Sequence, residues 1–135
     1  MHRVTGYDMN TITVLIIDSH PTFRDSLAGF LEAQGGMTLV GTAMSGQEGV
    51  VLAAKLRPDV VLIDLAMPDL PGLTPIPMLR TVAPESVIIA LSTLAADAEA
   101  YRAAAVATGA DDFVPKSKVT TELVPAIQRA MARKA

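Results

Sequence analysis

The chain has 135 residues, half of them apolar, with no cysteine and a formal net charge of −3. This length suits one domain with a substantial hydrophobic core. The absence of cysteine excludes disulfides, thiolate zinc sites and thiol nucleophiles, and the acidic balance argues against direct nucleic-acid binding by this chain. No segment has the length of a membrane span or the pattern of a secretory signal. We therefore expect a cytoplasmic domain over residues 12–135, preceded by a flexible polar extension over residues 1–11.

Two kinds of segment alternate along the chain after this extension. Short β-branched runs, several of them almost continuously apolar, predict strands that are buried on both faces of a sheet. These runs lie at residues 13–17, 37–41, 59–63, 87–91 and 112–114. Between the runs, apolar residues recur at helical spacing. Pro21 favours the start of the first helix, and the glycine pair at residues 35–36 favours its end.

Prolines mark the boundaries of several later elements. Pro75 and Pro77 fall near the start of the third helix, for which we expect Thr74 to be the cap. Residues 95–107 are rich in alanine and predict a fourth helix. Pro115 ends the fifth strand, where a proline is tolerated if the strand lies at the edge of the sheet. Five strands alternating with five helices predict an α/β fold, a flavodoxin-like, doubly wound parallel sheet with strand order 2-1-3-4-5.

Polar residues follow four of these predicted strands. They are Asp18 after the first strand, Asp64 after the third, Ser92 after the fourth and Lys116 after the fifth. Ligands of doubly wound sheets bind at the carboxyl ends of the strands, near the switch point between the first and third strands. Each of these residues alone would also suit a turn or a cap, but the four together indicate a functional site.

The chemistry that fits these residues is phosphoryl transfer to a carboxylate. Asp18 and Asp64 follow adjacent strands, and two carboxylates about 4 Å apart repel each other by roughly 4 kcal/mol at an effective dielectric constant of 20. A bound Mg²⁺ relieves this repulsion and neutralises charge on phosphoryl oxygens. Lys116 supplies a further positive charge to the phosphoryl group. Ser92 is a candidate switch residue, because its hydroxyl can bond to the phosphoryl group only after modification.

The motifs around these residues resemble those of the response-regulator receiver family of two-component systems, over residues 12–133. The matching segments are VLIIDSHP at residues 14–21, RPDVVLIDLAMP at 57–68, GL at 72–73, LS at 91–92 and GADDFVPK at 109–116. The histidine and proline after the first aspartate, and the RPD before the third strand, look most like receivers of LuxR/NarL-type regulators, which precede a DNA-binding domain.

The resemblance implies a role for each matching residue. These roles are Asp64 as phosphoacceptor, Asp18 and Asp64 in an acidic metal pocket, the Ala66 carbonyl as a metal ligand, Ser92 as switch hydroxyl, Phe113 as switch aromatic and Lys116 as phosphoryl-binding lysine. The resemblance also implies a sensor histidine kinase as partner and Mg²⁺ as cofactor. A second copy or an output domain is expected to contact the face formed by the fourth helix, the fifth strand and the fifth helix. The domain is expected to be a switch and not an enzyme.

The chain departs from the family pattern at three places. Ser19 occupies the position of the second acidic residue, which normally touches the metal directly, so Mg²⁺ should bind weakly or through water held by Asp18. Phe113 stands where tyrosine is common, so no hydroxyl can hold this side chain in an outward position. Pro115 precedes Lys116, whereas the family often has a proline after the lysine, so the loop that aims the lysine is expected to differ.

Two other functions are open. Ser19 motivates the first, an atypical pseudo-receiver that keeps the fold as an interaction module with weak or no phosphorylation. The second is a phosphatase of the haloacid dehalogenase type, which needs an acid two residues after its nucleophile; His20 stands there after Asp18, which disfavours it. We interpret His20, before Pro21, as a loop residue at a helix start rather than a metal ligand. Residues 111–112 are interpreted as a turn into the fifth strand.

Overall fold

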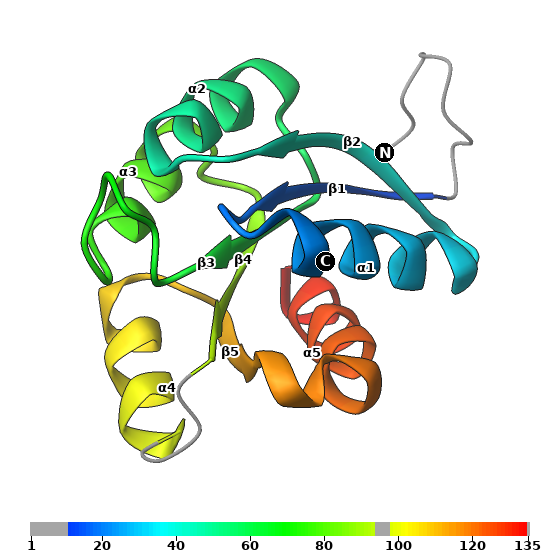
Figure 1. The fold of residues 1–135 in the computed structure, drawn as a ribbon. Coiled ribbons are helices and arrows are strands. Elements are labelled where there is room, and N and C mark those ends of the chain that lie inside the picture. Colours follow the sequence, from blue (N-terminus) through cyan, green and yellow to red (C-terminus); the bar gives the residue numbers. More distant parts are fainter. Residues whose placement is uncertain (1–10, 94–97, 135) are drawn as a thin grey trace.

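A computed structural model describes residues 11–93 and 98–134 of the chain (Figure 1). The expected polar extension therefore lies outside the described residues except for Thr11. The strands are β1 (Ile12–Ile17), β2 (Met37–Ala43), β3 (Val60–Asp64), β4 (Val87–Ser92) and β5 (Asp112–Pro115). The helices are α1 (Pro21–Ala33), α2 (Gly46–Leu56), α3 (Pro75–Val82), α4 (Ala98–Thr108) and α5 (Val119–Lys134), with a short 3₁₀ helix (Lys116–Lys118) before α5.

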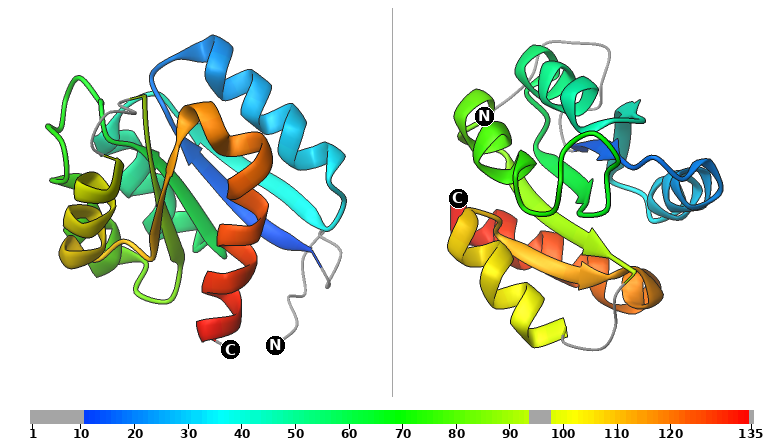
Figure 2. Two further views of the ribbon diagram at one scale, coloured as in Figure 1. Left: turned by 90° about the horizontal axis from the view of Figure 1, so that it is seen from below. Right: turned by 60° about the vertical axis from the view of Figure 1, so that its left-hand side comes forward.

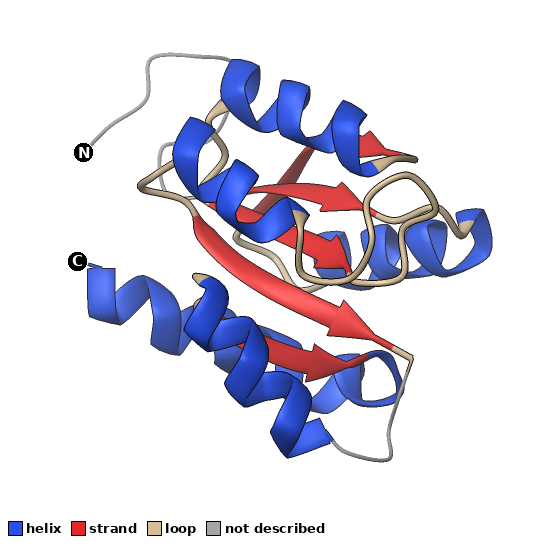
Figure 3. Cartoon of the chain, turned by 90° about the vertical axis from the view of Figure 1, so that its left-hand side faces the viewer, coloured by secondary structure: helices blue, strands red, loops and turns tan. Residues whose placement is uncertain are grey.

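The five strands form one parallel sheet in the order β2-β1-β3-β4-β5. The predicted fold class and strand order are therefore confirmed. Helices α1 and α5 cover one face of the sheet, and α2, α3 and α4 cover the other (Figures 1 and 3). Figure 2 shows the same layers from two further directions. No helix within residues 11–93 and 98–134 is long and apolar enough to cross a membrane.

Successive residues of β1, β3, β4 and β5 pack into opposite halves of the core. The half under α1 and α5 contains the strand residues Val14, Ile16, Val60, Leu62, Val87, Ile89, Leu91 and Val114. The half under α2, α3 and α4 contains Leu15, Ile17, Val61, Ile63, Ile88, Ala90 and Phe113. Because helices cover both faces, no strand needs a polar face, which explains the continuously apolar runs in the sequence.

The boundaries of the helices follow the sequence signals with one exception. Gly35, Gly36 and Gly109 have positive φ angles of 73°, 77° and 126°, which glycine adopts without a steric penalty, and they end α1 and α4. Thr74 directly precedes α3, but its side chain makes no capping hydrogen bond. Its backbone is already helical, at φ −52° and ψ −42°, whereas a capping side chain requires an extended backbone. Thr74 therefore stands at the predicted position before α3, but the prediction that its side chain caps the helix is wrong.

Helix α2 approaches β1 so closely that Gly49 has no room for a side chain. A Cβ atom at this position would lie 2.7 Å from Cγ1 and 2.8 Å from Cγ2 of Ile17, with Cδ1 closer still. Ile17 is fully buried and has little space to move away. We expect Gly49→Ala to lower the free energy of unfolding by about 1–3 kcal/mol, measured by urea denaturation.

Gly29 in α1 provides the matched control for this substitution. A Cβ atom there would meet nothing within 4 Å. Gly29→Ala should therefore leave stability unchanged or raise it by about 0.5–1 kcal/mol, the usual gain in a helix interior. Equal effects of the two substitutions would show that Ile17 moves away without cost, which would contradict its close packing against Gly49.

Candidate functional site

The parallel sheet brings the four predicted polar residues to one edge. Asp64 is the last residue of β3 and Ser92 the last of β4, while Asp18 directly follows β1 and Lys116 directly follows β5. Asp18, Asp64 and Ser92 are all buried. In the sheet register Ser92 pairs with Pro115, which places its strand end between those of β3 and β5. The convergence expected from the order of the strands is therefore present.

Lys116 lies between the two aspartates. Its Nζ atom is 2.7 Å from Asp18 Oδ2 and 3.3 Å from Asp64 Oδ2, and only 7% of the lysine side chain is exposed. Neither Oδ2 atom has a hydrogen bond of good geometry within the described residues, so these contacts are ion pairs rather than aligned hydrogen bonds. The ammonium also lies 4.3 Å from the centroid of the Phe23 ring, a favourable cation–π contact. One buried cation thus offsets part of the charge of two buried carboxylates.

The side chain of Asp64 is oriented by the loop that follows it. The backbone N–H of Ala66 donates a hydrogen bond to Asp64 Oδ1 at 3.0 Å. This local bond resembles the side-chain-to-backbone bonds of Asx turns. It holds Oδ1 toward the loop and leaves Oδ2 facing Lys116.

His20 also reaches this pocket, which the sequence interpretation missed. Its backbone N–H donates to Asp18 Oδ1 at 2.8 Å, and its Nδ1 lies 3.1 Å from the same oxygen and 3.4 Å from Asp64 Oδ2. His20 does precede α1, as expected of a loop residue at a helix start, but its ring also borders the carboxylates. The available signal was its position two residues after Asp18, where the N–H commonly bonds back to an aspartate side chain.

The pocket has the donor set that a divalent cation needs. Asp18, His20 and Asp64 each offer one ligand atom, and these atoms all lie within 4.8 Å of one another. The carboxylate oxygens are hard donors of the kind that Mg²⁺ prefers, and two of them are buried without a hydrogen bond. Ser19, in contrast, offers only a neutral hydroxyl, so the pocket has one carboxylate fewer than the family pattern.

The loop after Asp64 is tied to the start of α2. Asp69 accepts hydrogen bonds from the backbone N–H groups of Gly46, at 2.8 Å, and Gln47, at 2.9 Å. These two bonds favour the carboxylate, so they hold the pKa of Asp69 below its usual value of 3.8. The beginning of a helix is also a favourable place for a negative charge. Asp69 therefore connects the loop beside the acidic pocket to a neighbouring helix.

This connection predicts a pH-dependent change in the loop. A lowered pKa in the folded state means that the carboxylate stabilises the loop fully above about pH 3.8 and loses this effect as the pH falls through the lowered pKa. We expect the NMR titration of Asp69 to have its midpoint below 3.8, with the amide signals of Gly46 and Gln47 following it. Asp69→Asn should remove this step from both amide signals. A midpoint at or above 3.8 would contradict the helix contact.

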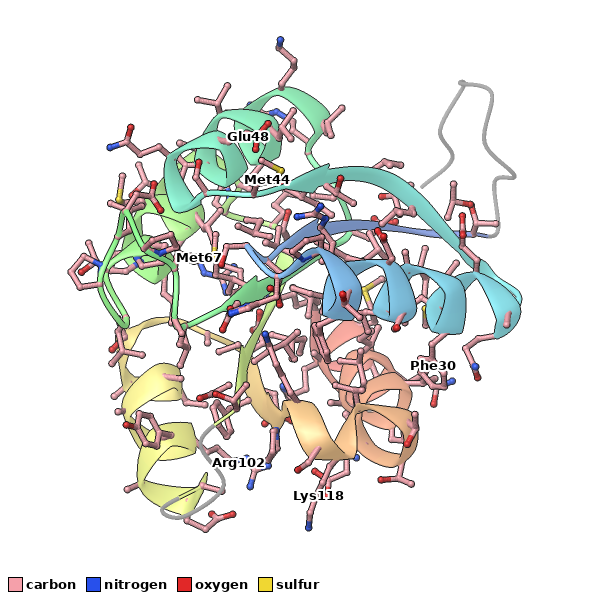
Figure 4. All side chains as sticks on the ribbon, in the orientation of Figure 1. Phe30, Met44, Glu48, Met67, Arg102 and Lys118 are labelled. Carbon is pink, nitrogen blue, oxygen red and sulfur yellow. The ribbon has the colours of Figure 1, made fainter. Side chains whose placement is uncertain are left out.

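The predicted switch aromatic is completely buried. Phe113 is 0% exposed, and its ring stacks on Tyr101 of α4 with the centroids 6.3 Å apart and the planes at 14°. Arg102 reaches from α4 toward β5 (Figure 4), where it donates to the carbonyl of Phe113 at 3.0 Å and pairs with Asp112. Packing and an arginine contact thus hold Phe113 inside the domain, without the hydroxyl of a tyrosine.

The two aspartates before Phe113 pair with arginines. Asp111 is bound by Arg80, with 2.9 Å between Nη2 and Oδ2. Asp112 is the first residue of β5 and lies 3.6 Å from Arg129 of α5, in addition to its contact with Arg102. Their position at the turn into β5 agrees with the sequence interpretation, and the ion pairs give both a structural role.

A doubly wound sheet with aspartates and a lysine at its carboxyl edge is the architecture of a receiver domain, a signalling switch rather than a metabolic enzyme. The family model of the response regulator receiver domain matches residues 14–128. The chain therefore belongs to the response regulator receiver family and is a receiver domain of a two-component response regulator.

Individual relatives agree with this assignment. The response regulator protein VraR of Staphylococcus aureus is 29% identical over 119 residues, which are 88% of this chain and 56% of that protein. The chain thus spans little more than half the length of this curated relative. The response regulator domain of Thermotoga maritima CheB is 30% identical, with a TM-score of 0.81, over 90% of this chain and 97% of the other.

LuxR/NarL-type regulators are among the similar structures, as the sequence motifs predicted. The receiver domain of NarL from Mycobacterium tuberculosis is 28% identical, with a TM-score of 0.81, over 91% of this chain and 98% of the other. A LuxR-family two-component response regulator from Aurantimonas sp. is 27% identical, with a TM-score of 0.83, over 91% of this chain and 86% of the other.

Proposed function

We propose that this domain is switched by transfer of a phosphoryl group from a sensor histidine kinase to Asp64. The observation that carries this proposal is the position of Asp64: its buried carboxylate faces a second buried carboxylate, Asp18, and lies 3.3 Å from the ammonium of Lys116. Such a pocket suits a dianionic phosphoryl group only when positive charge is supplied. Lys116 supplies one positive charge, and the donor set fits a divalent cation.

In the proposed reaction an Asp64 oxygen forms a bond to phosphorus, the bond from phosphorus to the kinase histidine nitrogen breaks, and the released imidazole takes up a proton. Asp18, Asp64 and the Ala66 carbonyl are the groups that would hold Mg²⁺, which neutralises charge on the phosphoryl oxygens when bound. Lys116, whose ammonium lies between the two aspartates, would bind a phosphoryl oxygen. Ser92 then donates a hydrogen bond to the new group.

The change at Asp64 is proposed to reach the surface through Phe113. Its ring packs between the sheet and Tyr101, so a movement of Ser92 at the end of the adjacent β4 alters the packing under α4. The face formed by α4, β5 and α5, with Arg102 and Arg129 on it, is the proposed contact surface for a second copy or an output domain. By analogy with the LuxR-family response regulators that the chain resembles, control of transcription in the cytoplasm is proposed as the output.

One observation favours the pseudo-receiver as a second candidate function. Ser19 removes one acidic ligand, and the pocket already has Lys116 and His20 against the remaining carboxylates. A chain of this kind would keep the fold and bind its partner without phosphorylation. Titration with Mg²⁺ separates the candidates: saturable binding near millimolar or tighter supports the switch, and no binding supports the interaction module.

The direct test of the switch is incubation with a small phosphodonor such as acetyl phosphate. The wild-type chain should gain the mass of one phosphoryl group in a reaction that requires a divalent cation. A chain that gains none with any divalent cation, while remaining folded, would contradict the proposal.

A further inference from the structure

The proposed phosphorylation leaves one polar group of the pocket without a role, the imidazole of His20. The ring contacts both carboxylates of the pocket. Its Nδ1 points at two carboxylate oxygens from different strands, Asp18 Oδ1 and Asp64 Oδ2, and its own backbone N–H anchors the residue on Asp18. The side chain is nevertheless 59% exposed, so the pocket is open to solvent on the side of this ring.

The separations of His20 Nδ1 from the two carboxylate oxygens are those of ligands that share one metal ion. Two ligands that bind an ion at about 2.1 Å lie roughly 3.0 Å apart at a right angle and roughly 3.4 Å apart at the tetrahedral angle. The observed separations from His20 Nδ1 are 3.1 Å to Asp18 Oδ1 and 3.4 Å to Asp64 Oδ2. An ion could therefore bind Nδ1 together with either oxygen, and the three candidate ligand atoms all lie within 4.8 Å of one another.

A second observation points independently to a cation. Asp18 and Asp64 are both 0% exposed, and each has a buried Oδ2 atom without a hydrogen bond among the described residues. Lys116 provides a single positive charge for the two carboxylates. Ser19 is neutral and supplies no carboxylate. The ring nitrogen of His20 is therefore the third candidate protein ligand, beside Asp18 and Asp64.

We propose that His20 Nδ1 is a metal ligand, and that it makes the acidic pocket select divalent cations that favour imidazole, such as Co²⁺ and Zn²⁺, over Mg²⁺. Neutral imidazole binds late first-row divalent ions well, whereas Mg²⁺ prefers oxygen donors and its own water. To act as a ligand, Nδ1 gives up its proton and the ring keeps the proton on Nε2. The inference rests on the proposed function in one respect, that the same acidic pocket holds the cation.

The test compares Co²⁺ and Mg²⁺ binding by isothermal titration calorimetry on the full chain. Carboxylates alone also bind Co²⁺ more tightly than Mg²⁺, so the informative quantity is the change produced by His20→Asn. We expect this variant to lose at least about 10-fold in Co²⁺ affinity and less than about 2-fold in Mg²⁺ affinity. His2 is the only other histidine of the sequence, and His2→Asn should leave both affinities unchanged.

A second readout observes the imidazole nitrogen directly. In the wild-type chain with ¹⁵N-labelled histidine, Zn²⁺ should shift the Nδ1 signal of one ring, and that signal should be absent from His20→Asn. Equal losses of Co²⁺ and Mg²⁺ affinity in His20→Asn, no loss of either, or no Zn²⁺ shift would overturn the assignment. Phosphoryl labelling of the wild type in Mg²⁺ is measured separately, so failure of His20 as a ligand is distinguishable from failure of Asp64 as phosphoacceptor.

Discussion

Asp64→Asn is expected to abolish phosphoryl labelling of the domain by acetyl phosphate. The amide that replaces the carboxylate has no anionic oxygen to attack phosphorus, and asparagine is nearly isosteric with aspartate, so the buried end of β3 keeps its packing. Intact-mass spectrometry in the presence of a divalent cation measures the result directly. The wild-type chain should gain one phosphoryl group, whereas the variant should gain none.

The matched control for this experiment is Asp25→Asn. Asp25 lies on α1 and is exposed, so the substitution changes the net charge equally without touching the pocket. Its labelling should equal that of the wild type. If Asp64→Asn were labelled as extensively as Asp25→Asn, the phosphoryl group would be on another residue and the proposed switch would be wrong.

Of the substitutions proposed for this domain, Lys116→Met is expected to lower the free energy of unfolding most. It leaves two buried carboxylates facing each other without their cation, while the unbranched methionine keeps most of the apolar contact with Phe23. Removing one partner of a buried ion pair typically lowers the free energy of unfolding by about 3–5 kcal/mol. Urea denaturation in EDTA should show a loss of this order. Because a divalent cation replaces the missing charge, its addition should restore part of the loss.

Lys118→Met is the matched control, which tests whether the loss of stability in Lys116→Met comes from the buried position of Lys116. Lys118 is two residues further along, its side chain is 61% exposed, and it points away from the domain (Figure 4). Its contact with Glu122, 3.9 Å long, is a surface pair, so its removal should change stability by no more than about 0.5 kcal/mol. Similar losses for the two variants, or no recovery of Lys116→Met with a cation, would contradict the charge balance proposed for the pocket.

The sequence by itself determined the fold and most of the site. Continuous β-branched runs and helical spacing are properties of neighbouring residues, and covered parallel strands require them, so the order β2-β1-β3-β4-β5 could be predicted. Once that order is known, residues that end strands must meet at one edge of the sheet. This is why Asp18, Asp64 and Lys116 were predicted together, and Lys116 is found within ion-pair distance of both aspartates.

Only the tertiary structure decided the contacts that depend on loop conformation. His20 turns its ring onto two carboxylates because the local turn after β1 directs it there, whereas its residue type and its proline neighbour suited an ordinary helix start equally well. Asp69 binds backbone groups 22 and 23 positions earlier in the chain, a distance at which no sequence periodicity operates. The stacking of Tyr101 on Phe113 likewise depends on how α4 packs against the sheet. Such contacts are set by the three-dimensional path of the backbone, and they surround the pocket that strand order alone had located.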